Sequence, residues 1–168
     1  MTLDEFWQII GGVHRDCGGD MDVKCALLAA ELRRLSLDQL CSFEEHFAQC
    51  EARAYDWGLW AAAEIISGGM CTDDPFWDFR STLISMGRET FDQALQDPQS
   101  LADLNYDADV ALYEGYQYVS ITVREELGYP AAACGIRLPD EPSGKPWDAE
   151  ELAARYPKLV KKYGDPAR

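Results

Sequence analysis

The first half of the chain repeats apolar residues at every third or fourth position, which is the period of an amphipathic helix. The first such stretch covers residues 3–10, and Thr2 and Glu5 before and within it have the spacing of a capping box. We expect this helix to end at Gly11-Gly12. A second helix is predicted over residues 23–35 by the same spacing.

A third helix is predicted to begin after Ser36, because Ser36 and Gln39 again have capping-box spacing. Its apolar face continues to Ala54. Polar residues fall mostly on the other side, so Glu44 and Glu51 are predicted to face water. The pattern is typical of a helix at the protein surface.

Residues 57–67 are apolar on nearly all sides of a helix, which predicts a central position in the fold. Gly68-Gly69 is expected to end this helix, because glycine enters the left-handed conformation without steric penalty. Asp73 or Asp74, which precede Pro75, has the position of an N-cap for the next helix. The helix that follows is predicted to run to Gly87.

The second half of the chain is less regular. A short helix is predicted over 88–95, and a polar connection over 98–109. The spacing from 110 to 127 favours one long helix closed by Gly128. A strand is the alternative over 113–123, where Tyr, Val, Ile and Thr are frequent.

The segment 129–147 contains four prolines and two glycines, so we expect an ordered loop across the body of the protein. Asp148 and Glu151 have the spacing to cap a terminal helix that is interrupted at Pro157. This helix is basic, and it is expected either to dock on the acidic body or to stay free as an interaction handle.

The predicted fold class is mainly α, a compact multi-helix single domain with a Pro-rich C-terminal loop and a short terminal helix. A chain of 168 residues with 47% hydrophobic residues suffices for one core. We place the helical core domain at 1–128. Residues 129–168 form the Pro-rich extension and the basic terminal helix, packed on or near the core.

The composition restricts the partners of this protein. Thirty acidic and fifteen basic residues give a formal net charge of −15. Such a field repels phosphate backbones and anionic lipids, so we predict no direct nucleic acid partner, no membrane partner, and a protein partner with a basic surface. The acidic N-terminus does not resemble a secretory signal, and we predict a cytoplasmic protein. The oligomeric state stays open.

Cysteine and histidine offer a possible metal site. His14 with Cys17, and His46 with Cys50, have spacings that place both side chains of a pair on one helical face. Reduced cysteines more often act as small hydrophobic residues, so we predict no metal and no cofactor. The six cysteines, all expected to be reduced, are Cys17, Cys25, Cys41, Cys50, Cys71 and Cys134.

No basic residue lies between Arg88 and Arg124, and this segment is strongly acidic. One interpretation is a surface that binds a basic protein, and the alternative is a solvated face that keeps the protein soluble. The candidate acidic binding face consists of Asp92, Asp97, Asp103, Asp107 and Asp109.

A second candidate site surrounds the turn from Gly69 to Pro75. Carboxylates beside aromatic residues can acquire separated pKa values and serve as general acid and base, although capping and core packing also explain these residues. The candidate pocket consists of Trp57, Trp60, Glu64, Asp73, Asp74, Trp77, Arg80 and Arg88.

Several short motifs of this chain together indicate a family. They are Asp4–Trp7, Trp57–Ala63, Ile65–Gly69, Asp73–Phe76, Phe79-Arg80, Leu83–Glu89 and Asp97–Ala102. With these motifs the chain resembles the bacterial domain-of-unknown-function family 4240. The resemblance spans about residues 3–125, and Met70-Cys71-Thr72 stands where a shorter polar link is expected. That family has no assigned activity, substrate or catalytic residues, so the resemblance implies no mechanism.

Two functional hypotheses follow. The first is an acidic protein-binding or regulatory module that neutralises a basic partner, for example a toxin. The alternative is a small-molecule enzyme in which Glu64, Asp73 and Asp74 act as acids or bases and Arg80 holds an anionic substrate. A plain structural subunit is a third interpretation.

Overall fold

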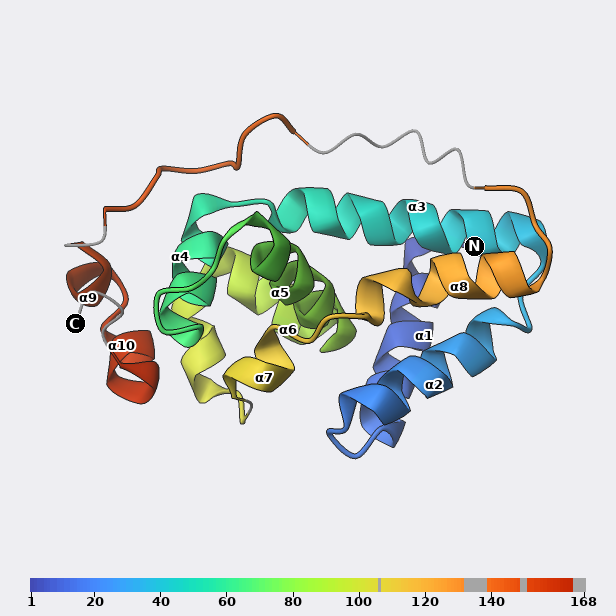
Figure 1. The fold of residues 1–168 in the computed structure, drawn as a ribbon, viewed down its shortest axis with the longest axis horizontal. Helices are drawn as coiled ribbons and strands as arrows, with labels where there is room; N and C mark the ends of the chain where they lie inside the picture. The colour runs from blue at the N-terminus through green and yellow to red at the C-terminus, as the bar shows by residue number, and fades with distance from the viewer. Residues whose placement is uncertain (106, 132–138, 149–150, 165–168) are drawn as a thin grey trace.

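Helices form almost all of the regular structure of this protein (Figure 1). The computed structural model describes residues 1–105, 107–131, 139–148 and 151–164. Within these ranges there is no β-strand, so the strand alternative for 113–123 is wrong. The predicted mainly α single domain with short C-terminal helices is confirmed.

The first and third helices begin where their capping boxes predict, whereas the second begins at Met21, two residues before its predicted start. In both capping boxes, Thr2 with Glu5 and Ser36 with Gln39, each side chain bonds the other residue's main-chain N–H. Asp20 caps the second helix by accepting a hydrogen bond from the main-chain N–H of Val23. The three helices are α1 (Leu3–Asp16), α2 (Met21–Leu32) and α3 (Leu37–Ala54).

The predicted end of α1 at Gly11-Gly12 is wrong, because the helix continues to Asp16. Two interior glycines cost about 1 kcal/mol each relative to alanine. The additional turn buries Val13, which is only 4% exposed, against the core. The chain turns instead at Gly18 and Gly19, whose φ values are 62° and 90°.

The central helices are α4 (Trp57–Ile66), α5 (Asp73–Ser85) and α6 (Arg88–Gln96). Gly68, Gly69 and Gly87 have positive φ values of 69°, 91° and 93°, which confirms the predicted breaks. The predicted aspartate cap of α5 is wrong, because Thr72 occupies the N-cap. Asp73 and Asp74 lie inside the first helical turn, where negative charge stabilises the helix dipole.

The predicted long helix over 110–127 is wrong, because Gly115, with a φ of 130°, interrupts it. Here the chain turns so that Tyr116, 1% exposed, enters the core. Gly128, with a φ of 67°, ends the last helix of this segment, as predicted. The α-helices in this part are α7 (Ala108–Ala111) and α8 (Val119–Glu126). Two shorter-pitched 3₁₀ helices, η1 (Pro98–Asp103) and η2 (Tyr116–Tyr118), precede them in turn.

Two short helices follow near the C-terminus, α9 (Leu152–Arg155) and α10 (Pro157–Tyr163). The predicted interruption at Pro157 is confirmed, because α10 begins there. Glu151 stands at the N-cap of α9 and makes no side-chain capping bond. Helix α10 contacts α4 and η1, and Lys162 Nζ donates a hydrogen bond of 3.0 Å to the Ala102 carbonyl.

The Pro-rich segment contacts the body at its described residues. Ser143 forms an isolated parallel bridge with Asp56, where α4 begins. The main-chain N–H of Trp57 donates to the Ser143 carbonyl over 2.9 Å, and the N–H of Ser143 donates to the Tyr55 carbonyl over 2.9 Å. The Asp56 carboxylate also caps α4 through the N–H groups of Gly58 and Leu59. This contact joins the loop to the start of α4.

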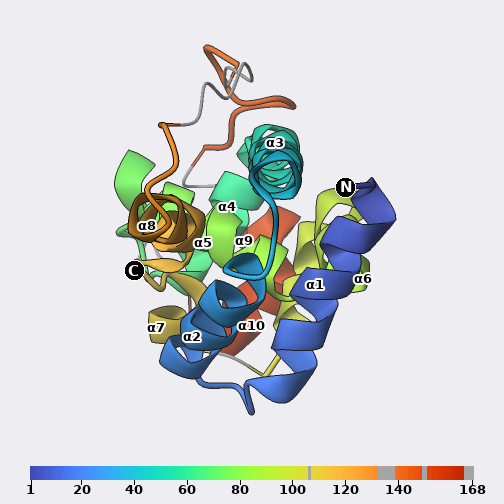
Figure 2. The same cartoon turned by 90° about the vertical axis from the view of Figure 1, so that its right-hand side faces the viewer.

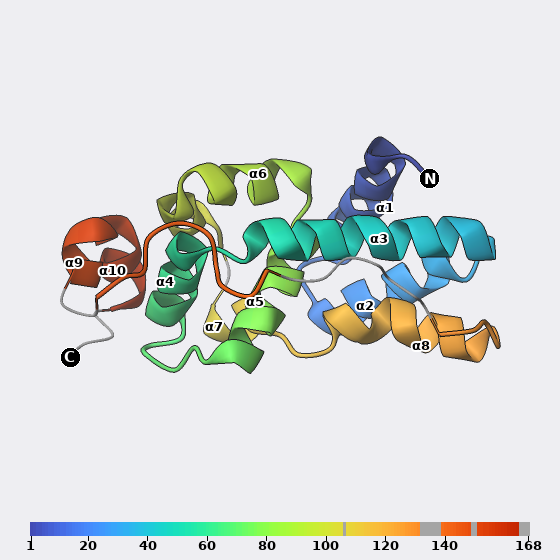
Figure 3. The same cartoon turned by 90° about the horizontal axis from the view of Figure 1, so that it is seen from above.

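Helix α3 extends along the molecule, with α1 and α6 on one side and α8 on the other (Figure 3). Helix α5 lies under α3 and contacts α1, α3, α4, α6, α7 and η2. Seen from the end, α1 and α2 lie below α3 (Figure 2).

Among the described residues, no helix has both the length and the apolar character needed to cross a membrane. The aromatic residues that are less than 2% exposed are Phe6, Phe43, Phe76, Phe79, Phe91 and Tyr116.

Candidate functional site

The aromatic residues of α4 and α5 form a stacked series. The ring centroids of Trp57 and Trp60 are 5.3 Å apart, and those of Trp60 and Phe76 are 4.6 Å apart. The Trp60 indole N–H donates to the Cys71 carbonyl over 2.7 Å, and Glu64 accepts from the Cys71 N–H over 2.9 Å. Trp60 and Glu64 therefore hold the main chain of the loop that leads into α5.

Arg80 is buried below this series and is only 4% exposed. Its guanidinium lies 5.0 Å from the ring centroid of Tyr55 and 5.1 Å from that of Phe76. It also donates to the main-chain carbonyl of Glu51 over 3.2 Å. Burial lowers the pKa of Arg80, and the nearby Glu51 opposes this effect. Arg80 thus has partners within the core.

The structure separates Arg88 from the other candidate pocket residues. Arg88 lies at the start of α6 and pairs with Asp4 of α1 over 2.8 Å. It also pairs with Asp92 of its own helix over 3.6 Å. Asp73 and Asp74, in contrast, are exposed on α5. The turn thus combines Trp57, Trp60 and Glu64 with two exposed carboxylates, whereas Arg88 joins α6 to α1.

Three members of the candidate acidic face have partners within the protein. Asp92 also pairs with Arg53 over 3.3 Å. Asp97 caps η1 by accepting from the Gln99 N–H over 3.0 Å. Asp107 caps α7 in the same way. The other two members, Asp103 and Asp109, are exposed.

A second group of carboxylates lies where α5 and η2 meet. Burial raises the pKa of Asp78, and the negative charges of Glu114 and Asp74 raise it further. The side-chain amide of Gln117 donates to Asp78 and opposes the shift. Met70, in the loop before α5, is 74% exposed. Negative charge and an exposed apolar side chain therefore occur together near the start of α5.

A groove of about 450 Å³ opens between α3 and α8. We call it the α3–α8 groove. Its volume lies within the range of about 300–1,000 Å³ that is typical of small-molecule sites. Ile121 of α8 lines it and is 49% exposed. The residues that define this groove are Phe47, Ala48, Glu51, Trp77, Ile121 and Tyr129.

Glu51 lies in the wall of the groove and is 9% exposed, so the prediction that it faces water is wrong. The Trp77 indole N–H donates to Glu51 Oε1 over 2.8 Å. Burial raises the pKa of Glu51 to about 7, and Arg80 and Trp77 limit this shift. Helix α3 is covered here by α5, which turns a polar position into a buried one.

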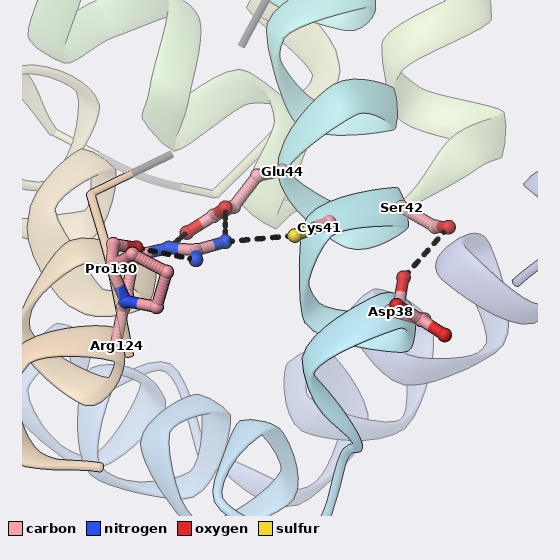
Figure 4. Close-up of polar contacts among 6 residues, drawn as sticks. All are labelled: Asp38, Cys41, Ser42, Glu44, Arg124 and Pro130. Carbon is pink, nitrogen blue, oxygen red and sulfur yellow. Dashed lines mark hydrogen bonds and ion pairs between the residues drawn. The ribbon is translucent and has the colours of Figure 1, made fainter. Parts of the chain in front are cut away.

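Glu44 is also not a water-facing residue, because it forms a buried ion pair with Arg124 of α8. Arg124 Nε donates to Glu44 Oε1 over 3.0 Å, and Nη2 donates to Glu44 Oε2 (Figure 4). Arg124 Nη1 donates to the Pro130 carbonyl over 2.9 Å, and Nη2 lies 3.3 Å from Cys41 Sγ. The hydrogen bond to Glu44 raises the pKa of Arg124. This pair joins α3, α8 and the chain that follows α8.

Periodicity along α3 does not reveal these roles, because it places Glu44 and Glu51 on the solvent side. Glu44, Phe47 and Glu51 recur at intervals of three and four, so they form one stripe beside the main apolar face. Arg124 was also identifiable as the first basic residue after an acidic stretch. Neither signal shows which helix covers the stripe.

The described residues contain no cluster of three or more histidine, cysteine or acidic side chains that could hold a metal ion. Cys17 Sγ donates to the main-chain carbonyl of His14 over 3.2 Å. The five described cysteines, from Cys17 to Cys71, are free thiols. Cys134 lies outside the described residues.

Comparisons with known proteins give one match. Neither the curated proteins nor the solved structures contain a match to this chain. A family model described as "Protein of unknown function (DUF4240)" matches residues 1–129, which include all the elements from α1 to α8. The predicted family is thereby confirmed: the chain belongs to the DUF4240 family of proteins of unknown function.

Proposed function

We propose that this protein binds a basic surface of another protein through a face at the start of α5. We call it the α4–α5 face, and it consists of Met70, Asp73, Asp74, Asp78 and Glu114. The observation that carries the proposal is Met70, 74% exposed, in the loop next to the exposed carboxylates of Asp73 and Asp74, which form no ion pair with any described residue.

The composition of this face supports the proposal. Protein interfaces combine an apolar centre with a polar rim, and methionine is enriched in them. The negative charges of Glu114 and Asp74 raise the pKa of Asp78, and a cationic partner relieves this repulsion. Helix α7, which contacts α4 and α5, adds Asp107 and Asp109 to the neighbouring surface.

The net charge of −15 favours a basic protein over a nucleic acid as the partner. We place this interaction in the cytoplasm and regard neutralisation of the basic partner as its regulatory effect. An enzyme at the Gly69–Pro75 turn is the weaker proposal, because Trp60 and Glu64 already bond the main chain of Cys71.

The test uses a photo-reactive phenylalanine analogue in place of Met70, which crosslinks only what touches this position. We expect one stoichiometric basic protein to be crosslinked from native lysate. The purified partner is expected to bind tightly at about 0.05 M salt and at least tenfold more weakly at about 0.5 M, because salt screens exposed charges. Titration calorimetry with the purified pair measures this difference.

The double change Asp73→Asn and Asp74→Asn is expected to weaken binding of the purified partner at least tenfold. The matched control is Asp38→Asn with Glu89→Gln, which removes the same charge from the first turns of α3 and α6. Equal affinity of the two double variants contradicts the proposal. So does crosslinking of the same protein when the analogue replaces the exposed Val23 of α2.

A further inference from the structure

The α3–α8 groove contains a buried carboxylate with unused hydrogen-bonding capacity. Glu51 Oε1 accepts from the Trp77 indole, whereas Oε2 accepts no hydrogen bond from the described residues. Arg80, the nearest cation, bonds the main-chain carbonyl of Glu51 and not its carboxylate. Within the described part of the chain, this carboxylate therefore has no ion-pair partner.

Two other polar side chains of the groove, Arg124 and Gln117, already have partners. Arg124 uses Nε, Nη1 and Nη2 for Glu44, Pro130 and Cys41. The Gln117 carbonyl accepts from the Gly115 N–H and the Ser81 hydroxyl, and its amide donates to Asp78. The positive charge of Arg124 is thus compensated by Glu44, whereas a ligand that donates hydrogen bonds finds the Glu51 carboxylate.

Apart from Ser120 and Glu125, the rest of the lining is apolar, and it includes a half-exposed isoleucine. Ile121 is 49% exposed although it belongs to the groove wall. Phe47 and Tyr129 contribute aromatic surface on either side. A bound apolar group removes this surface from water, which favours binding.

We propose that the α3–α8 groove binds a small organic amine with an apolar body, whose ammonium group lies against the Glu51 carboxylate. The apolar body lies along Phe47 and Ile121. Because the Glu44–Arg124 pair is neutral overall, Glu51 and Glu125 give the groove a net negative charge that favours a cation. This site is separate from the α4–α5 face, so either proposal can fail alone.

A ligand of the α3–α8 groove is required to carry a positive charge. Burial raises the pKa of Glu51 to about 7, so near neutral pH the cost of its ionisation is small enough for an ammonium partner to offset. A neutral alcohol of the same shape forms one hydrogen bond without charge compensation. A carboxylate of the same shape meets like charge and is excluded.

The experiment titrates the intact protein with 2-phenylethylamine, 2-phenylethanol and 3-phenylpropanoate while recording two-dimensional NMR spectra. The indole N–H signal of Trp77, assigned by its loss in Trp77→Phe, reports directly on the Glu51 contact. We expect a saturable shift with the amine and at least tenfold weaker binding of the alcohol and the acid. Capped lysine amide, which carries an ammonium without an aromatic body, is expected to bind more weakly than 2-phenylethylamine.

Three variants separate the site from general effects of charge. Glu51→Gln keeps an acceptor for Trp77 and is expected to reduce affinity for the amine at least tenfold. Glu45→Gln removes one exposed charge from the same helix and is expected to leave the affinity unchanged. Ile121→Trp fills the groove from a half-exposed position and is expected to abolish binding while α3 and α8 stay folded.

Several outcomes overturn the proposal. Amine and alcohol binding with equal affinity shows that charge is not recognised. Unchanged affinity in both Glu51→Gln and Ile121→Trp places the amine elsewhere, and absence of any saturable shift with 2-phenylethylamine removes the site. Capped lysine amide binding as tightly as the aromatic amine contradicts the requirement for an apolar body.

Discussion

At the scale of single residues, the interior of this protein contains ionisable groups that are held in different ways. Glu44 and Arg124 compensate each other across two helices. Lys24 is 2% exposed, donates to Ser85 Oγ over 3.1 Å, and has a pKa lowered by burial. Glu51 is held by an indole N–H. A buried charge with a neutral partner costs free energy, whereas a buried pair offsets much of that cost.

Glu51 therefore gives a pH-dependent stability. Its pKa is about 7 in the folded protein against a reference value of 4.5, so the folded state binds more protons between these values. The wild type loses stability as the pH rises through this window, and above it the loss is complete. Glu51→Gln removes the ionisation, so relative to wild type it is expected to be more stable by up to about 3 kcal/mol at about pH 8.

Urea unfolding of both proteins at about pH 4 and about pH 8 measures this difference. At the lower pH the two proteins are expected to have nearly equal stability, because Glu51 is protonated in both the folded and the unfolded wild type. Glu45→Gln, on the exposed side of α3, is the control and is expected to show no such trend. A constant difference at both pH values contradicts the raised pKa of Glu51.

At the scale of elements, glycines determine where the helices end only when their φ is positive. Gly11 and Gly12 lie within α1 and have no positive φ, so the helix continues through them. Gly115 has a φ of 130° and divides the segment that was predicted as one long helix. The predicted end of α1 at Gly11-Gly12 and the predicted long helix over 110–127 are wrong for one physical reason. In both places the burial of an apolar side chain, Val13 or Tyr116, outweighs the local preference of the chain.

Alanine substitutions at these glycines are expected to act in opposite directions. Gly115→Ala forces a side chain into a positive-φ conformation, 3.4 Å from the Tyr113 ring, and is expected to destabilise the protein by about 1–3 kcal/mol. Gly12→Ala adds a methyl group to a helical position and is expected to stabilise it by up to about 1 kcal/mol. Denaturant unfolding measures both. Stabilisation by Gly115→Ala is the result that rejects this account of the break.

At the scale of the whole molecule, α10 connects a distant part of the chain to the helices of the family region. Leu159 of α10 is fully buried, and Lys162 donates to the carbonyls of Ala102 and Leu104. Lys162 thus bonds main-chain oxygens in and next to η1, and an apolar side chain anchors the helix. This arrangement leaves Lys158 and Lys161 exposed.

Leu159→Ala is expected to cost about 2–5 kcal/mol of docking free energy, because it leaves a cavity where α10 meets α4 and η1. Hydrogen exchange of the α10 amides is the direct measurement, and their protection is expected to fall while that of α3 stays high. Lys161→Ala, an exposed change in the same helix, is expected to leave the protection of both α10 and α3 unchanged. Equal loss of protection in α3 and α10 is the outcome that contradicts separate docking of this helix.

The sequence alone determined the mainly α fold, the helix starts at Thr2 and Ser36, and the breaks at Gly68-Gly69 and Gly87. These features depend on local chemistry, since a cap or a positive-φ glycine acts within a few residues. The family resemblance was also available from local motifs, and the family model confirms it.

Only the tertiary structure decided which polar side chains are buried. Glu44 and Glu51 have the same spacing as exposed residues of α3, and they become buried because α8 and α5 cover that stripe. The α3–α8 groove and the ion pair of Arg124 likewise depend on contacts across 80 residues of chain. Burial is a property of the neighbours that a residue acquires on folding, and periodicity along one helix does not specify which neighbours those are.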